Sequence, residues 1–152
     1  MTIRPVSPGD RPAVLRLSAR LAEQGTPAGR DMAQVERADA QSISTAMDDP
    51  SPQTQVLVAE IDGQVMGFVH VKTVLDYYTQ APIGHVSDLV VAKQAQGLGM
   101  GRKLLEAAQS WAKAQGYAMV QLFVLPENAQ ARLLYERAGY RPEWIKYVRP
   151  ID

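Results

Sequence analysis

The chain has 152 residues, enough for one domain (residues 1–152) with a real hydrophobic core, and its 16 basic and 16 acidic side chains balance. This balance argues against a nucleic-acid surface. The absence of cysteine excludes disulfides, thiolate metal sites and an acyl-cysteine intermediate, and two histidines, His70 and His85, are too few for a dedicated metal site. No apolar run could span a bilayer and no signal peptide is recognisable, so we expect a cytoplasmic protein that binds neither membranes nor nucleic acid.

The first half of the chain predicts one strand, two helices and then three strands. Ser7-Pro8-Gly9-Asp10 supplies capping chemistry for the first helix, and Asp62-Gly63 is typical of a hairpin turn. A looser stretch around Tyr77 and Tyr78 precedes the last of these strands. The expected elements are a strand at Thr2 to Val6, a helix through Val14 to Leu21, a helix at Asp31 to Met47, and strands at Gln55 to Ile61, Gln64 to Val74 and His85 to Ala92.

The second half predicts a helix, a strand, a helix and a closing strand. The first helix follows Gly101 and stops at Gln115-Gly116, where glycine suits the position after a helix end. Ala118 to Leu125 is nearly all apolar, which favours a central strand. A last helix opens at Pro126-Glu127-Asn128, and Glu143 to Val148 is expected to close the sheet. The predicted order is β-α-α-β-β-β-α-β-α-β.

The stretch Gln96-Gly97-Leu98-Gly99-Met100-Gly101 lies between an expected strand and an expected helix. A glycine-rich turn at a helix start presents backbone N–H groups to a phosphate, although such turns also join strands to helices with no ligand. A P-loop would need Lys-Ser/Thr after the last glycine, whereas Arg102-Lys103 stands there. The dinucleotide fingerprint fails as well, because no third glycine has the required spacing.

Together with a second segment, this turn carries a family resemblance. Gln-x-x-Gly-x-Gly, read as Gln96, Gly99 and Gly101, is similar to the pyrophosphate-binding motif of the GNAT acetyltransferase superfamily. The segment from Asn128 to Tyr140, with its Leu-Tyr-Glu and Gly-aromatic ending, resembles the second coenzyme A segment of that family. The resemblance implies an α/β (α+β) fold with a central mixed, mostly antiparallel sheet flanked by helices, and acetyl-CoA as co-substrate.

The resemblance also implies which residues hold coenzyme A. The strand Leu89-Val90-Val91 would lie along the pantetheine arm, with a backbone amide polarising the thioester carbonyl. The amides of Gly97, Leu98, Gly99, Met100, Gly101 and Arg102, together with Gln96, would hold the pyrophosphate. Asn128 would contact the pantetheine, although helix capping alone also explains an asparagine there. Arg102 is equally consistent with a solvated helix face.

For catalysis, the resemblance implies that an amine attacks the thioester directly in a ternary complex. Tyr135 is the expected proton donor to the departing thiolate, and simple packing is its alternative. The strand that carries a glutamate base in some relatives reads Val120-Gln121-Leu122-Phe123-Val124 here, without a carboxylate. The remaining bases are His85, Asp88, a water molecule, or none if the amine arrives neutral. Strand alternation places His85 and Asp88 on opposite faces, so they are not expected to reach one substrate.

These observations predict an N-acetyltransferase that transfers acetyl from acetyl-CoA to a primary amine. The acceptor is a small-molecule amine or a peptide amine, and Tyr77 and Tyr78 form either an aromatic wall for it or an ordinary exposed loop. The alternatives are a non-catalytic acyl-CoA sensor, and transfer of a longer acyl chain or transfer to oxygen. A homodimer is compatible with the sequence, since the closing strand would leave a sheet edge to cover.

Overall fold

The computed structural model describes all 152 residues as one five-stranded sheet with helices on both faces. The strands are β1 (Thr2–Pro5), β2 (Thr54–Ile61), β3 (Gln64–Leu75), β4 (Pro82–Val91) and β5 (Val120–Leu122). The helices are α1 (Arg11–Ser18), α2 (Met32–Asp48), α3 (Met100–Ala114) and α4 (Ala129–Arg137). Short 3₁₀ segments cover Pro8–Asp10, Ala19–Gln24 and Lys93–Ala95.

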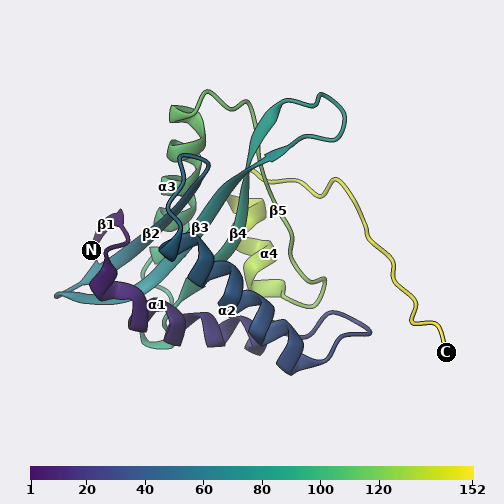
Figure 1. Cartoon of the computed structure of the whole chain (residues 1–152), viewed down its shortest axis with the longest axis horizontal. Helices are drawn as coiled ribbons and strands as arrows, with labels where there is room; N and C mark the ends of the chain where they lie inside the picture. Colours follow the sequence, from purple (N-terminus) through teal and green to yellow (C-terminus); the bar gives the residue numbers. More distant parts are fainter.

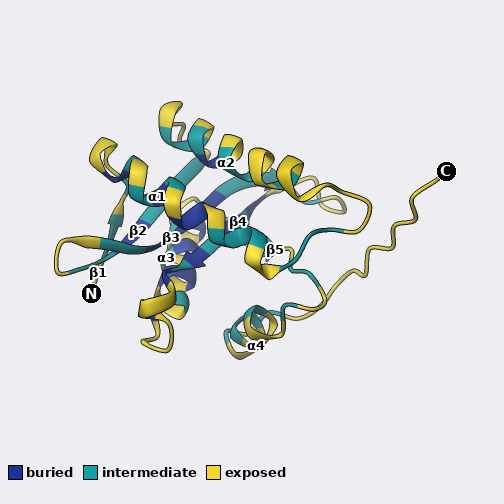
Figure 2. Ribbon diagram, turned by 90° about the horizontal axis from the view of Figure 1, so that it is seen from below, coloured by how far each residue is buried: buried dark blue, intermediate teal, exposed yellow.

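The strands follow the chain order β1-β2-β3-β4-β5 across the sheet. The first four are antiparallel neighbours, and β5 runs parallel to β4. Helices α1 and α2 cover one face, while α3 and α4 lie on the other (Figure 2). The expected mixed, mostly antiparallel sheet flanked by helices is therefore confirmed.

The core fills the space between the sheet and its helices. Phe68 and Val90 are neighbours across β3 and β4, and Leu104 and Leu105 of α3 pack from the other side with no exposed surface. Gly67 permits this close approach, because a Cβ there would lie 2.9 Å from both the Met100 sulfur and the Val90 carbonyl oxygen. Helix α3 is thus held tightly against β3 at the point where it begins. None of the helices is both long and apolar enough to cross a membrane.

Two expectations about the sheet are wrong. Residues 118–125 do not form a central strand: only Val120–Leu122 pair, and they form the edge of the sheet. Glu143 to Val148 form no strand, and residues 141–152 run extended and exposed (Figure 1). They touch the body where Trp144 stacks on Tyr78 and where Pro150 lies beside Gly29. The two differences have one physical cause, because without a closing strand beside it β5 has a neighbour on one side only.

Candidate functional site

The glycine turn connects β4 to α3 and leaves a row of backbone donors free. Gly97 and Gly99 have φ values of +79° and +76°, the left-handed region that glycine adopts without strain. The first helical hydrogen bond of α3 runs from the Lys103 N–H to the Gly99 carbonyl oxygen, 3.1 Å away. The N–H groups from Gly97 to Arg102 have no backbone acceptor in the chain. A Cβ added at Gly97 or Gly99 would meet nothing within 4 Å, so the turn faces open space.

This geometry fits a phosphate ligand. Unpaired N–H groups at a helix N-terminus lie at the positive end of the helix dipole, where they attract and bind anions. The Arg102 side chain is instead paired with Glu106, whose Oε1 lies 2.9 Å from its Nε, on an exposed helix face. In this structure the Arg102 side chain is thus engaged by Glu106, and the group that Arg102 presents to a ligand at the turn is its backbone N–H.

Strands β4 and β5 separate beyond a short parallel ladder. They pair only at Gly84 to Val86 of β4, so the rest of β4 has no partner on that side. The Ala92 N–H donates to the Met66 carbonyl oxygen on β3, and because successive amides alternate in direction, those of Leu89 and Val91 face the unpaired side. The guanidinium of Arg20 donates to the Val91 carbonyl oxygen there. The separated strands expose backbone groups to which an extended chain can bind.

The second motif lies next to this opening. Asn128 is the N-cap of α4: its Oδ1 accepts from the Ala131 N–H at 3.2 Å, and its Nδ2 donates to Gln24 Oε1 at 2.8 Å. Both predicted roles of Asn128, capping and facing the site, are thus compatible. A cavity of about 400 Å³ joins the two motifs. It is lined by Arg20, Glu23, Gln24, Gln96, Glu127, Asn128, Ala129 and Gln130.

Tyr135 of α4 is partly buried and packs against the core beside Tyr140, with ring centroids 6.1 Å apart. Burial, together with the neighbouring Tyr140 and Asp88, raises its pKa to about 12. The phenol is therefore fully protonated at neutral pH. Full proton transfer from it to a thiolate whose acid has a pKa of about 8.5 is uphill, so its chemistry is mainly that of a hydrogen-bond donor.

The two base candidates lie on one face of the sheet, contrary to the expectation from strand alternation. A β-bulge shifts the register of β4, so that Asp88 pairs with His70 and Val86 with Val71, which leaves Ser87 without a partner. His85 pairs with Lys72, and on the unbulged β3 His70 and Lys72 share a face. The extra residue reverses the alternation, and the sequence pattern carries no signal for it.

This shared face is the one covered by α1 and α2. A Cβ added at Gly84 would contact Ala112, and one added at Gly67 would contact Met100; both contacts are on α3. The next residues along the strands, His85 and Phe68, therefore face α1 and α2. Burial, and then the nearby charge of Asp88, raise the pKa of Asp39 on α2. The hydroxyl oxygen of Ser87 is the one buried side-chain polar atom without a hydrogen-bond partner. The bulge therefore places His85, Asp88 and His70 together on the α1–α2 face, near Asp39 of α2.

His85 is suited to accept a proton near neutral pH. Burial lowers its pKa below 6.5, and the positive charge of Lys72 lowers it further, against an opposing effect of Asp88. Its Nδ1 lies 3.1 Å from Gln121 Nε2 on β5. With the amide nitrogen donating, Nε2 carries the proton; if the amide turns over, Nδ1 is protonated and Nε2 is free to act as a base. Gln121 therefore controls which nitrogen is available.

Sequence reasoning missed His70, which lies opposite Asp88. The two side chains are 3% and 8% exposed, and His70 Nδ1 lies 3.2 Å from Asp88 Oδ2. On its other side, His70 Nε2 lies 3.1 Å from Thr54 Oγ1. The signal available in the sequence was a single histidine within the apolar run Val69-His70-Val71, which strand alternation alone did not link to Asp88.

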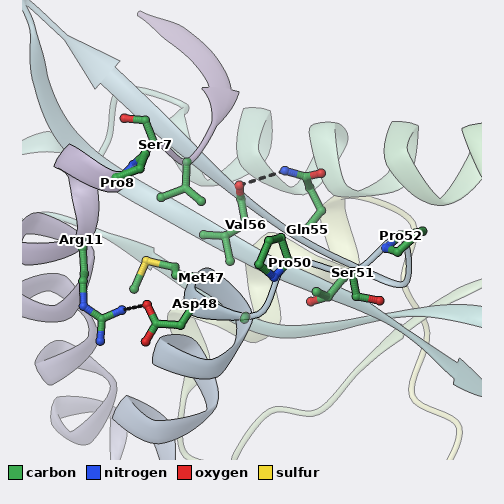
Figure 3. Close-up of a pocket in the computed structure, with 13 residues that line it drawn as sticks. Ser7, Pro8, Arg11, Met47, Asp48, Pro50, Ser51, Pro52, Gln55 and Val56 are labelled. Atoms are coloured by element: carbon green, nitrogen blue, oxygen red, sulfur yellow. Dashed lines mark hydrogen bonds and ion pairs between the residues drawn. The ribbon is translucent and has the colours of Figure 1, made fainter.

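A larger pocket of about 660 Å³ lies between the ends of α2 and β1 and the start of β2 (Figure 3). Arg11 and Asp48 form an ion pair across it, and Gln55 Nε2 donates to the Val56 carbonyl oxygen at 3.2 Å. Thr54, the partner of His70, also lines this pocket. None of the residues expected from the sequence to bind or react lies there, so pocket size alone does not locate the chemistry.

The comparisons with known proteins agree with the two motifs. The profile of a family described as an acetyltransferase (GNAT) domain matches residues 52–142. This chain belongs to the GNAT acetyltransferase family. A solved structure from Pyrococcus furiosus has the same fold, with a TM-score of 0.80, 23% identity and 99% coverage of both chains.

Curated GNAT relatives extend over different parts of the chain. A mycothiol acetyltransferase of Stackebrandtia nassauensis is 34% identical over 147 residues, which is 92% of this chain and 44% of the relative. An aminoglycoside N(6')-acetyltransferase type 1 of Stenotrophomonas maltophilia is 31% identical over 97 residues, 61% of this chain and 63% of the relative. The chain spans less than two thirds of the length of these relatives.

Proposed function

We propose that residues 1–152 form a single acetyl-CoA-dependent N-acetyltransferase domain that transfers acetyl directly to a primary amine in a ternary complex. The observation that carries this proposal is the row of unpaired N–H groups from Gly97 to Arg102, at the start of α3 and beside the opening between β4 and β5. A diphosphate at the turn and an extended pantetheine arm between the strands fit these two features.

In this proposal the donor is held mainly by backbone groups. The turn residues Gln96 to Arg102 bind the pyrophosphate, and Leu89, Val90 and Val91 pair with the pantetheine as a neighbouring strand would. Asn128 and Arg20 must exchange their present partners, Gln24 and the Val91 carbonyl, for ligand contacts. An amide of β4 that faces the opening stabilises the developing negative charge on the thioester oxygen, an effect worth roughly 3–4 kcal/mol.

His85 accepts the proton of the attacking amine. Asp88 does not react itself but acts as a positioning residue through its contact with His70. The lowered pKa of His85 keeps its imidazole neutral at pH 7, whereas Asp88 is already engaged by His70. The amine attacks the thioester carbonyl and the carbon–sulfur bond breaks. With the Gln121 amide turned so that its oxygen accepts from a protonated Nδ1, the proton of the amine goes to His85 Nε2. Tyr135 stabilises the departing thiolate by hydrogen bonding, and the thiol proton is regained from solvent.

The acceptor approaches from the α1–α2 face, where His85, Asp88 and Asp39 gather. Carboxylates and an imidazole suit an amine that carries further hydrogen-bonding groups. Two relatives of this chain are named for mycothiol and for aminoglycosides, and we propose a polar amine as the acceptor here.

The proposal is tested by following thiol release from acetyl-CoA with a panel of primary amines, from aminoglycosides to peptides. Because the chain has no cysteine, a thiol reagent reports only the product. We expect amine-dependent release that Tyr135→Phe reduces. Donor binding without release for any amine would favour the acyl-CoA sensor instead.

A further inference from the structure

One carboxylate, Asp88, acts on three titratable groups of the proposed site. It is almost fully buried and lies on the same face of the sheet as His85. Burial lowers the pKa of His85, and burial raises the pKa of Tyr135 and of Asp39. The charge of Asp88 acts on the same three groups and raises the pKa of each. The residues that fix this carboxylate in place therefore influence all three.

The surroundings of His85 contain charges of both signs. Burial lowers its pKa most, and Lys72, its partner on β3, lowers it further. A charge on His70 lowers it as well, whereas Asp88 opposes all these effects. From β5, Gln121 contacts the imidazole without adding a charge. Asp88 is thus the one neighbour that favours a protonated His85.

The Asp88 carboxylate is held through one oxygen only. His70 Nδ1 lies 3.2 Å from Asp88 Oδ2, and no second side chain or backbone group donates to this carboxylate. Ser87 Oγ is the one fully buried side-chain polar atom without a partner, so the unpaired Oδ1 of Asp88 reaches solvent. His70 therefore ties down one oxygen and leaves the other free.

Thr54, at the start of β2, holds His70 from its other side. Its Oγ1 lies 3.1 Å from His70 Nε2 and 3.5 Å from the Val71 carbonyl oxygen. The hydroxyl can donate to a neutral imidazole, or accept from a charged one while it donates to Val71 instead. Both nitrogens of His70 thus have a partner in either protonation state, with the Nδ1–H directed at Asp88.

We propose that His70 is a positioning residue for the acetyl transfer: with Thr54 it fixes the Asp88 carboxylate and offsets its charge, and so sets how readily His85 takes up a proton. This inference rests on the proposed role of His85 as the base. Without its single hydrogen-bond donor, Asp88 would present an uncompensated negative charge beside His85, which favours the imidazolium form.

The first test follows the imidazole signals of His85 by NMR through a pH titration. Because the chain has two histidines, a variant at position 70 leaves His85 as its only imidazole. In His70→Leu the midpoint of the His85 titration should rise by about 0.5 pH unit or more. In His70→Asn, the matched control, the amide can donate from about the position of Nδ1, so the midpoint should stay near the parent value. An unchanged midpoint in His70→Leu would overturn the inference.

The second test asks whether His70 acts through Asp88. Asp88→Asn should lower the midpoint of His85, because it removes the charge that raises it. Adding His70→Leu to this variant should then change little. A rise as large as that in the parent background would mean that His70 acts on His85 directly, contrary to the proposal.

A pair of Thr54 variants keeps the test decisive if His70→Leu does not fold. Thr54→Val removes the hydroxyl at His70 Nε2 at nearly constant shape, whereas Thr54→Ser retains it. We expect a smaller rise of the His85 midpoint in the first variant and none in the second. Equal midpoints in the two variants would contradict the part given to Thr54.

Kinetics separate this inference from the proposed function. With an active amine, the acidic limb of kcat/KM should move upward in His70→Leu by the same amount as the NMR midpoint. A limb that stays in place while the NMR midpoint moves would overturn the role of His70 in the reaction. Absence of thiol release with every amine would instead overturn the proposed function, while the titration of His85 would still decide the link from His70 to Asp88.

Discussion

At the scale of single residues, a substitution at Tyr135 should change turnover without changing the binding of the donor. Removing its hydroxyl deletes a donor to the leaving thiolate, so Tyr135→Phe should lower kcat by about 10- to 100-fold. Because the ring and its packing remain, the affinity for acetyl-CoA should not change. Steady-state kinetics beside a thermal shift with coenzyme A checks both halves; unchanged turnover would reduce Tyr135 to a packing residue.

The pH dependence of the reaction rate follows from the protonation state of His85. A base must be neutral to accept a proton, so the rate should rise with pH through the pKa of His85, and the midpoint of this rise should lie below that of an ordinary histidine because burial lowers the pKa. No loss from Tyr135 ionisation is expected up to about pH 10, given its pKa of about 12. His85→Gln should abolish the acidic limb. A limb that persists in this variant would assign the proton to another group.

Asp10 links stability to pH. Its Oδ2 lies 2.7 Å from Arg4 Nη1 and accepts from the Ser7 N–H at 2.8 Å; the hydrogen bond from Arg4 is the main cause of its lowered pKa. In the folded protein the pKa of Asp10 lies below its unfolded value of about 3.9. The stabilisation of the fold by this carboxylate is therefore complete above about pH 3.9 and is lost as the pH falls further. Asp10→Asn should cost about 1 kcal/mol at pH 7, after solvent screening, and less near pH 2. Urea unfolding at both pH values measures this difference; an equal loss at both would mean that charge is not its origin.

At the scale of elements, the glycine turn supplies a matched pair of substitutions. Gly99→Ala places a side chain at φ +76°, which costs roughly 1–2 kcal/mol and disturbs the turn that we propose binds the pyrophosphate. Gly9→Ala is the control, because an added Cβ at either position meets nothing within 4 Å and Gly9 needs no left-handed backbone. Urea unfolding and a coenzyme A titration should both respond to the first change and neither to the second. Equal affinities for coenzyme A would remove the turn from the donor site.

Local chemistry explains which elements the sequence could predict. The Asp62-Gly63 hairpin, the stop at Gly116 and the cap at Asn128 all depend on neighbours in the chain, and all three are confirmed. The bulge at Ser87 depends on how β4 fits β3, so alternation placed Asp88 and His85 on opposite faces in error. The link between His70 and Asp88 was hidden for the same reason.

At the scale of the whole molecule, the motifs predicted the fold better than periodicity did. The apolar run at 118–125 is equally consistent with a central strand and with the short edge strand observed, and only the path of residues 141–152 separates the two. The arrangement of the first four strands needed no such information, because each pairs with its neighbour in the chain.

The central claim, a coenzyme A site at the Gln96 to Gly101 turn, is tested most directly by thermal unfolding with acetyl-CoA, coenzyme A and ATP. At a hundred times its dissociation constant a ligand adds about 2.7 kcal/mol, which for a domain of this size raises Tm by roughly 5–10 °C. We predict this shift with both coenzyme A species and none with ATP. The absence of a shift with either species, for a folded protein free of copurified ligand, would contradict the account.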